Sequence, residues 1–135
     1  SLSAPFILML EVPAEARLSS GIDELVRELG FTLEIPLIKA VAGSGALLNV
    51  ARETLSASEF TQISEFMSGV ERLIQQADNV IQTPMPKSMG EMPRVMDELG
   101  LPAGSTDKFK TFALQYIRGR GGRKIVGLLQ RAWKA

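Results

Sequence analysis

Apolar residues recur along most of the chain with the spacing of amphipathic helices. The first such stripe consists of Ile22, Leu25, Val26 and Leu29, at i, i+3, i+4 and i+7. This spacing places the four side chains on one face of a helix, and charged residues fill the positions between them. We expect the helix to end at Gly30, because glycine is the usual residue just beyond a helix C-terminus.

Further stripes of the same kind follow, separated by residues that start and stop helices. Ser56 with Glu59, and Ser88 with Glu91, have the S-x-x-E spacing of a capping box, so we expect a helix to start at each. Glycines mark the expected breaks at Gly69, Gly100 and Gly119–Gly122. The pattern predicts an all-α fold, a compact bundle of roughly six to eight short helices.

An apolar segment precedes the first predicted helix and does not continue its stripe. This segment contains Phe6, Ile7, Leu8, Met9 and Leu10. It has the outline of a secretion signal, but no basic residues stand before it and Pro5 interrupts it. We therefore predict an apolar N-terminal arm over residues 1–18 and a single all-α domain over residues 19–135. We expect the arm to pack on a protein partner or on a neighbouring subunit.

Two parts of the domain have the same order of landmarks: a Glu-Leu-Gly, a Gly-rich turn and a Leu-Leu-x-x-Ala helix. The landmarks are Glu28–Gly30, Gly43–Gly45 and Leu47–Ala51, and then Glu98–Gly100, Gly119–Gly122 and Leu128–Ala132. Two interpretations remain open. A duplication would give two three-helix halves related by pseudo-twofold symmetry, whereas a chance similarity would give no symmetry.

The chain contains neither Cys nor His among its 135 residues. This composition excludes a thiolate nucleophile, a disulfide framework, Cys-ligated zinc, an imidazole base and a conventional haem site. Gly43–Gly45 lacks the further glycines and the lysine of nucleotide-binding loops, so it favours close helix packing over phosphate binding. We expect a protein that is not an enzyme and that carries no cofactor or metal.

Charge is unevenly distributed although fifteen basic residues balance fifteen acidic ones. Residues 105–135 carry a net charge of +7, against −4 for residues 1–34 and −3 for residues 35–104. The candidate anion-binding residues around the second Gly-rich turn are Arg118, Arg120, Arg123 and Lys124. Their candidate ligands are nucleic acid and an anionic lipid surface. Docking between subunits explains the asymmetry equally well, because the chain as a whole is neutral.

Methionines recur at helical spacing in one segment. They are Met85, Met89, Met92 and Met96, at i, i+4, i+7 and i+11. Thioether ligands suit Cu(I), but prolines interrupt a single helix here, and methionine is also an adaptable packing and contact residue. We favour packing or partner contact over copper, so these four are candidate partner-contact residues.

Small residues and leucines form a series of short motifs between about residues 22 and 132. The motifs are Gly43-x-Gly45-Ala46-Leu47-Leu48-x-x-Ala51, Leu55-Ser56-x-x-Glu59-Phe60, Gly69-Val70, Leu99-Gly100-Leu101, Tyr116, Gly121-Gly122 and Leu128-Leu129-x-x-Ala132. Together they resemble the bacterial helical family of unknown function VcgC/VcgE. The resemblance implies no activity, and it implies export because many members look exported. Ser68, where proline commonly precedes Gly69, and the methionine segment depart from the family pattern.

Two functional hypotheses follow. The first is a non-catalytic helical module for protein–protein interaction or self-association, a homo-oligomer or a partner-bound protein, which uses the arm and the methionine segment. The second is an anion-binding module that uses the basic Gly-rich turn. No apolar run reaches the roughly 18 residues of a membrane span, so we expect no transmembrane segment. The absence of Cys fits the cytoplasm of a bacterium and an export route equally well.

Overall fold

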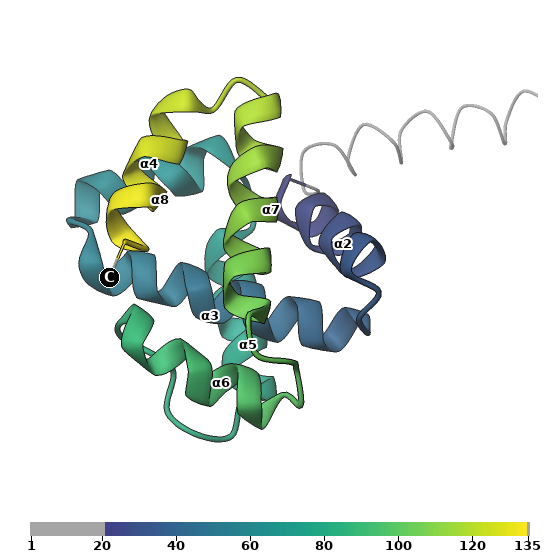
Figure 1. The fold of residues 1–135 in the computed structure, drawn as a ribbon. Helices are drawn as coiled ribbons and strands as arrows, with labels where there is room; N and C mark the ends of the chain where they lie inside the picture. Colours follow the sequence, from purple (N-terminus) through teal and green to yellow (C-terminus); the bar gives the residue numbers. More distant parts are fainter. Residues whose placement is uncertain (1–20, 135) are drawn as a thin grey trace, which may run out of the picture.

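The computed structural model describes residues 21–134, which form seven α-helices, one 3-10 helix and no strand (Figure 1). The elements are α2 (Gly21–Leu33), α3 (Leu37–Thr54), α4 (Ala57–Phe66), α5 (Val70–Val80), η1 (Met89–Glu91), α6 (Met92–Glu98), α7 (Ser105–Gly119) and α8 (Arg123–Ala132). The predicted all-α fold is confirmed, and the number of helices lies within the predicted range.

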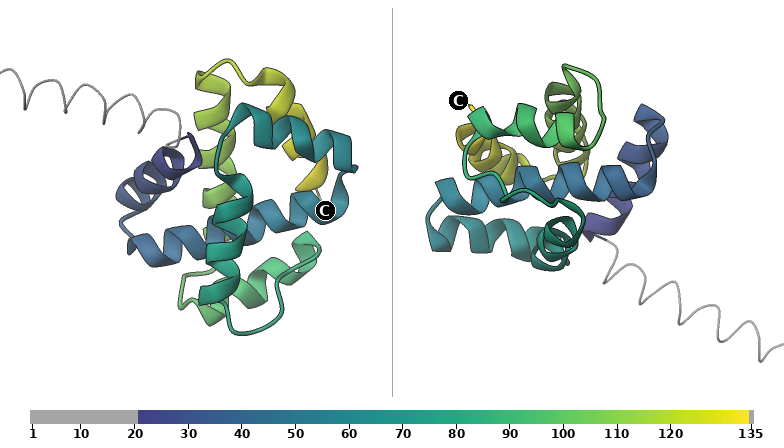
Figure 2. Two further views of the ribbon diagram at one scale, coloured as in Figure 1. Left: turned by 180° about the vertical axis from the view of Figure 1, so that it is seen from behind. Right: turned by 90° about the horizontal axis from the view of Figure 1, so that it is seen from below.

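α3 is the central helix of the molecule. It contacts every other α-helix, and Figure 2 shows it between α5 on one side and α6 with α7 on the other. From Ala40 to Ala51 nearly every residue of α3 is buried. Because neighbours surround it, this stretch has no polar face, and small residues let the neighbours approach closely.

The Gly43–Gly45 segment lies in the middle of α3, and the turn predicted there is wrong. Gly43 lies against Phe109 of α7, where a Cβ would come within 2.5 Å of ring atom Cε2. Gly45 lies against α5, where a Cβ would overlap that of Ala77 and come within 2.9 Å of the Leu73 carbonyl oxygen. Each glycine costs the helix about 1 kcal/mol in intrinsic stability, which the close packing offsets.

α2 runs past its predicted end. Gly30 is helical and buried, and the helix continues for three further residues. The chain then turns at Glu34, whose φ of 57° is the only positive value of a non-glycine residue within 21–134. The Glu34 N–H donates to the Phe31 carbonyl (3.3 Å) and the Ile35 N–H donates to the Gly30 carbonyl (3.0 Å). These two bonds form a Schellman motif with an acidic residue where glycine is usual.

The two similar parts of the sequence have different structures. Glu28–Gly30 lies inside α2, whereas Glu98–Gly100 ends α6 and its glycine has a φ of 71°. Gly43–Gly45 is helical, whereas Gly119–Gly122 contains the turn between α7 and α8. The first part therefore contains two helices where the second contains three, and the described residues give no support to a duplication.

One of the two predicted capping boxes forms. At the start of α4, the Glu59 N–H donates to Ser56 Oγ (3.2 Å) and the Ser56 N–H donates to Glu59 Oε1 (3.0 Å). The bond from the Ser56 backbone is the largest cause that lowers the pKa of Glu59. A helix does begin after Ser88, with η1 and then α6, but the Ser88 side chain makes no capping bond, so the second box is absent; the Lys87 N–H donates to Glu91 (3.4 Å).

Candidate interaction surfaces

The junction between α2 and α3 exposes three large apolar side chains. Phe31 is 87% exposed, Leu37 53% and Ile38 59%. They are three of the four large hydrophobic residues that are exposed in the described part of the chain. Single exposed apolar residues are ordinary, but a group of them on one surface marks a contact site. We call these three residues the apolar corner.

Helix geometry explains why the corner is exposed. Phe31 follows Ile22 by nine residues, which at 3.6 residues per turn puts it half a turn from the buried stripe of α2. Leu37 and Ile38 lie in the first turn of α3, before its neighbours enclose it at Ala40. The sequence contained one usable signal that the predictions above missed, an apolar residue opposite the stripe at the end of a helix.

An open groove of about 1040 Å³ lies beside the apolar corner. Its lining is Arg27, Glu28, Gly30, Phe31, Thr32, Glu34, Ile35 and Leu37. Glu28 and Glu34 are exposed and have no hydrogen-bond or ion-pair partner among the described residues. The nearby Lys39 directs its Nζ elsewhere, to within 3.6 Å of where a Cβ on Gly100 would lie. The groove thus combines an apolar surface with two acids against one arginine.

A three-residue contact attaches α2 to α7 away from the corner. The Tyr116 hydroxyl donates to Glu24 Oε1 (2.9 Å), and Arg120 pairs with the same oxygen at 3.4 Å. The guanidinium of Arg120 lies 3.8 Å from the centre of the Tyr116 ring, a cation–π geometry. Burial, and next the bond to Glu24, raise the pKa of Tyr116 far above its ordinary value. Arg120, a predicted anion-binding residue, is therefore engaged in holding two helices together.

The Gly-rich turn after α7 is the end of that helix. The Gly122 N–H donates to the Ile117 carbonyl (3.0 Å) and the Gly121 N–H donates to the Arg118 carbonyl (3.1 Å), which is again a Schellman motif. Gly121 has a φ of 81°, which disfavours other residues. A Cβ on Gly122 would come within 2.6 Å of the Phe66 ring. Backbone conformation thus accounts for one glycine and close packing for the other.

The other three predicted anion-binding residues are available at this turn. Arg118, Arg123 and Lys124 are exposed, and none has a hydrogen-bond or ion-pair partner within the described range. The first turn of α8 contains no acidic residue, so Arg123 and Lys124 face the positive end of the helix dipole without a counter-charge. We call these three residues, with the 37% exposed Phe66 beside them, the basic turn.

The four candidate methionines do not form one stripe. Met92 and Met96 belong to α6 and are buried in the core. Met85 and Met89 precede α6 and are half-buried. Met89 and Met96 line a groove of about 530 Å³ near the start of α7, and Met85 lines a separate one of about 520 Å³ beside α3 and α5. Packing accounts for Met92 and Met96, whereas partner contact stays a prediction for the two half-buried residues.

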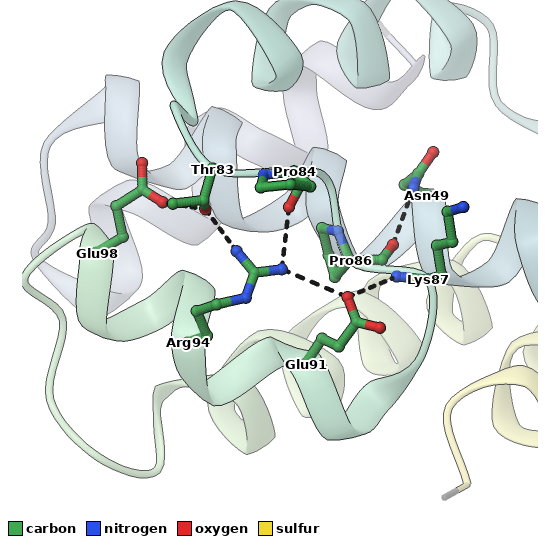
Figure 3. Close-up of polar contacts among 8 residues, drawn as sticks. All are labelled: Asn49, Thr83, Pro84, Pro86, Lys87, Glu91, Arg94 and Glu98. Carbon is green, nitrogen blue, oxygen red and sulfur yellow. Dashed lines mark hydrogen bonds and ion pairs between the residues drawn. The ribbon is translucent and has the colours of Figure 1, made fainter.

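Two side chains of α6 hold the segment before it (Figure 3). Arg94 donates to the Thr83 hydroxyl oxygen and to the Pro84 carbonyl (2.9 Å). Glu98 accepts from the Thr83 hydroxyl and from the Gln82 N–H (2.7 Å). The bond from Thr83 is the largest cause that lowers the pKa of Glu98.

A buried amide of α3 holds the same segment from the other side (Figure 3). Asn49 donates from Nδ2 to the Pro86 carbonyl (2.9 Å) and accepts at Oδ1 from Arg52 (2.7 Å). Arg52 in turn pairs with Glu71 at 2.6 Å. These polar groups satisfy one another, so the network positions residues 82–88 and supplies no free ligand group.

The candidate contact residues of the arm, Phe6, Ile7, Leu8, Met9 and Leu10, lie outside the described residues. Within 21–134 no single helix is long and apolar enough to cross a membrane. α2 and α3 together have the length and the apolar composition of a membrane span, but the chain bends by 120° between them. In the same range no cluster of three acidic side chains could hold a metal ion.

The fold defines a small all-helical domain with an apolar corner and a basic turn on its surface. The chain belongs to the protein family of unknown function VcgC/VcgE, whose family model matches residues 10–134. The resemblance expected from the sequence motifs is thereby confirmed. No curated protein and no solved structure matches the chain.

Proposed function

We propose that this protein is a non-catalytic helical module that binds protein partners, a second copy of itself included, through the apolar corner. The observation that carries the proposal is the exposure of Phe31, Leu37 and Ile38 at the α2–α3 junction of a domain whose other large apolar residues are mostly buried. Removing apolar surface from water contributes about 25 cal/mol per Å² before the entropic cost of association is subtracted. An exposed group of this kind therefore favours association.

The backbone at the corner supports the same proposal. Glu34 has a left-handed conformation that costs a residue with a Cβ roughly 1 kcal/mol or more. Strained conformations of this kind cluster at functional sites, and here a glutamate stands at the end of α2 where glycine would relieve the strain. The strained residue lies between Phe31 and Leu37 and lines the same groove as both.

Native mass spectrometry of the full chain, purified from its own host, tests the proposal. We compare wild type with Phe31→Ser and with a matched exposed control on α5, Gln76→Ser. Both positions are exposed, so neither change disturbs the core. We expect wild type and the control to appear as a multimer or with a bound protein, and Phe31→Ser to appear alone. A monomeric wild type without a bound protein, or an unchanged Phe31→Ser complex, contradicts the proposal.

A second candidate function is anion binding at the basic turn. Three exposed cations without partners in the described range, at a helix start that lacks an acid, favour it. Affinity for a short DNA duplex or for vesicles with anionic lipid should fall as salt rises, and Arg123→Ala should lower the slope on DNA by about one. An affinity that does not change with salt concentration contradicts this function. Arg120 is unsuitable for the test because it pairs with Glu24 of α2.

A further inference from the structure

The two surfaces are complementary in chemistry. At the corner, Phe31 is accompanied by the exposed carboxylates of Glu28 and Glu34. At the basic turn, Phe66 is accompanied by Arg123 and Lys124. Each surface thus has an apolar centre beside a net charge, which is negative at the corner, where Arg27 offsets one of the two acids, and positive at the turn. The four large hydrophobic residues exposed within 21–134 all belong to one or the other surface.

The two surfaces lie at opposite ends of the α2–α7 pair (Figure 1). The first half of α2 contacts the last turn of α7 through Glu24 and Arg120. The last residue of α2, Leu33, lines a small groove with Lys108 and Phe112 nearer the start of α7. The two helices therefore run in opposing senses and cross obliquely, and the 15 residues of α7 span about 20 Å with the basic turn at the far end. The corner and the basic turn of one copy are too far apart to contact each other.

We propose that the apolar corner of one copy binds the basic turn of a second copy, with Glu28 and Glu34 facing Arg123 and Lys124. This inference rests on the proposed function and names its partner. Two such contacts related by a two-fold axis form a closed, isologous dimer, whereas one contact per pair of copies is heterologous and forms a ring or a head-to-tail chain.

Charge favours a second copy over other occupants of the corner. Glu34 lines the same groove as Phe31 and Leu37, and with Glu28 it outweighs the charge of Arg27 there, so contact with anionic lipid or nucleic acid would be unfavourable. A partner that suits the corner must supply apolar surface together with positive charge. Residues 105–135 of this chain carry a net charge of +7, and the basic turn displays part of it beside an exposed phenylalanine.

A charge exchange between full-length chains tests the contact. The corner variant is Glu28→Lys with Glu34→Lys, and the turn variant is Arg123→Glu with Lys124→Glu. All four side chains are exposed, and the turn variant places acids at the start of α8, which favours that helix. The readouts are sedimentation equilibrium and native mass spectrometry at low and high salt, with circular dichroism as the folding control.

We expect wild type to self-associate more weakly at high salt, and each variant alone to lose at least about tenfold in association constant. An equimolar mixture should recover association, because every contact between unlike chains then joins opposite charges. Mass spectrometry should show the two variants in a one-to-one ratio. A mixture that stays monomeric, or a single variant that assembles like wild type, overturns the inference.

Failure of this inference is distinguishable from failure of the proposed function. If Phe31→Ser abolishes a complex that the charge variants leave intact, the corner is a contact surface and its partner is not the basic turn. If wild type is monomeric and carries a different protein that Phe31→Ser releases, a second copy is not the partner of the corner. The proposed function as a protein-binding module then still holds. If Phe31→Ser changes neither the self-association nor the binding of a different protein, both proposals are wrong.

Discussion

The hydroxyl of Ser44 is a polar group that the core leaves unsatisfied. Ser44 is 6% exposed, and its Oγ is the only buried side-chain nitrogen or oxygen within 21–134 without a hydrogen-bond partner. It lines a cavity of about 20 Å³ with apolar residues that include Phe109 and Trp133. A buried hydroxyl without a partner costs about 1 kcal/mol or more.

Ser44→Ala should therefore raise the free energy of unfolding by about 1 kcal/mol, since it removes this cost and alanine is the better helix former. Urea titration followed by circular dichroism measures the change, and the slope with urea should stay the same. A loss of stability would mean that the hydroxyl has a partner, such as a water bound in the cavity.

Glu34 offers a second test at the residue scale. Glycine has no Cβ to clash in the left-handed conformation, so Glu34→Gly should raise the free energy of unfolding by about 0.5–1 kcal/mol after its greater freedom in the unfolded chain is subtracted. The matched control is Glu53→Gly, inside α3, which should lower stability by about 1 kcal/mol. Equal effects of the two substitutions would contradict the strain at Glu34.

At the scale of the helix, glycine has opposite roles in α3 and in α8. A Cβ at Gly45 would collide with α5, whereas a Cβ at Gly127 would meet nothing within 4 Å. Gly45→Ala should therefore lower the free energy of unfolding by roughly 1–3 kcal/mol, and Gly127→Ala should raise it by about 0.5–1 kcal/mol. Thermal and urea unfolding measure the free energy of unfolding of both variants. A Gly45→Ala variant that is more stable than wild type would contradict the close packing of α3 on α5.

The segment before α6 is held by a carboxylate, which gives it a pH dependence. Hydrogen bonds lower the pKa of Glu98 below its usual 4.5, so its contribution is present above that pH and is lost as the pH falls through the lowered value. Amide exchange measured by NMR should show Gln82 protected at neutral pH and less protected under acid. Glu98→Gln should lower that protection at neutral pH and remove its dependence on pH; protection equal to wild type would exclude the role of Glu98.

The helices that the sequence predicted best are those with one buried face. α2 and α8 place apolar residues on a single stripe, so periodicity located both. α3 has neighbours on all sides, and its small residues gave a glycine pattern that predicted a turn. Glycine occurs both in loops and where two helices pack closely, and the sequence alone does not show whether a second helix lies nearby. Gly30 was misjudged for this reason as well, since it lies close to Ala40 across the α2–α3 junction.

At the scale of the molecule, the basic turn was predictable, whereas only Phe31 of the apolar corner had a signal in the sequence. Charge excess can be counted along a chain, and Arg118, Arg123 and Lys124 are exposed as the sequence indicated. Arg120 could not be separated from them, because its partner Glu24 is 96 residues away. The corner depends on which apolar residues remain uncovered after folding, and this is a property of the packed domain.

The apolar arm gives the last prediction. The buried face of α2 is closely packed, since Ile22, Leu25 and Leu29 are each at most 2% exposed. We predict that residues 1–16 contribute to association and not to the fold. Deletion of residues 1–16 should leave the far-ultraviolet circular dichroism per residue of the domain unchanged while it weakens association in sedimentation experiments. Unchanged association would exclude the arm from the contact and leave the corner as the surface that binds.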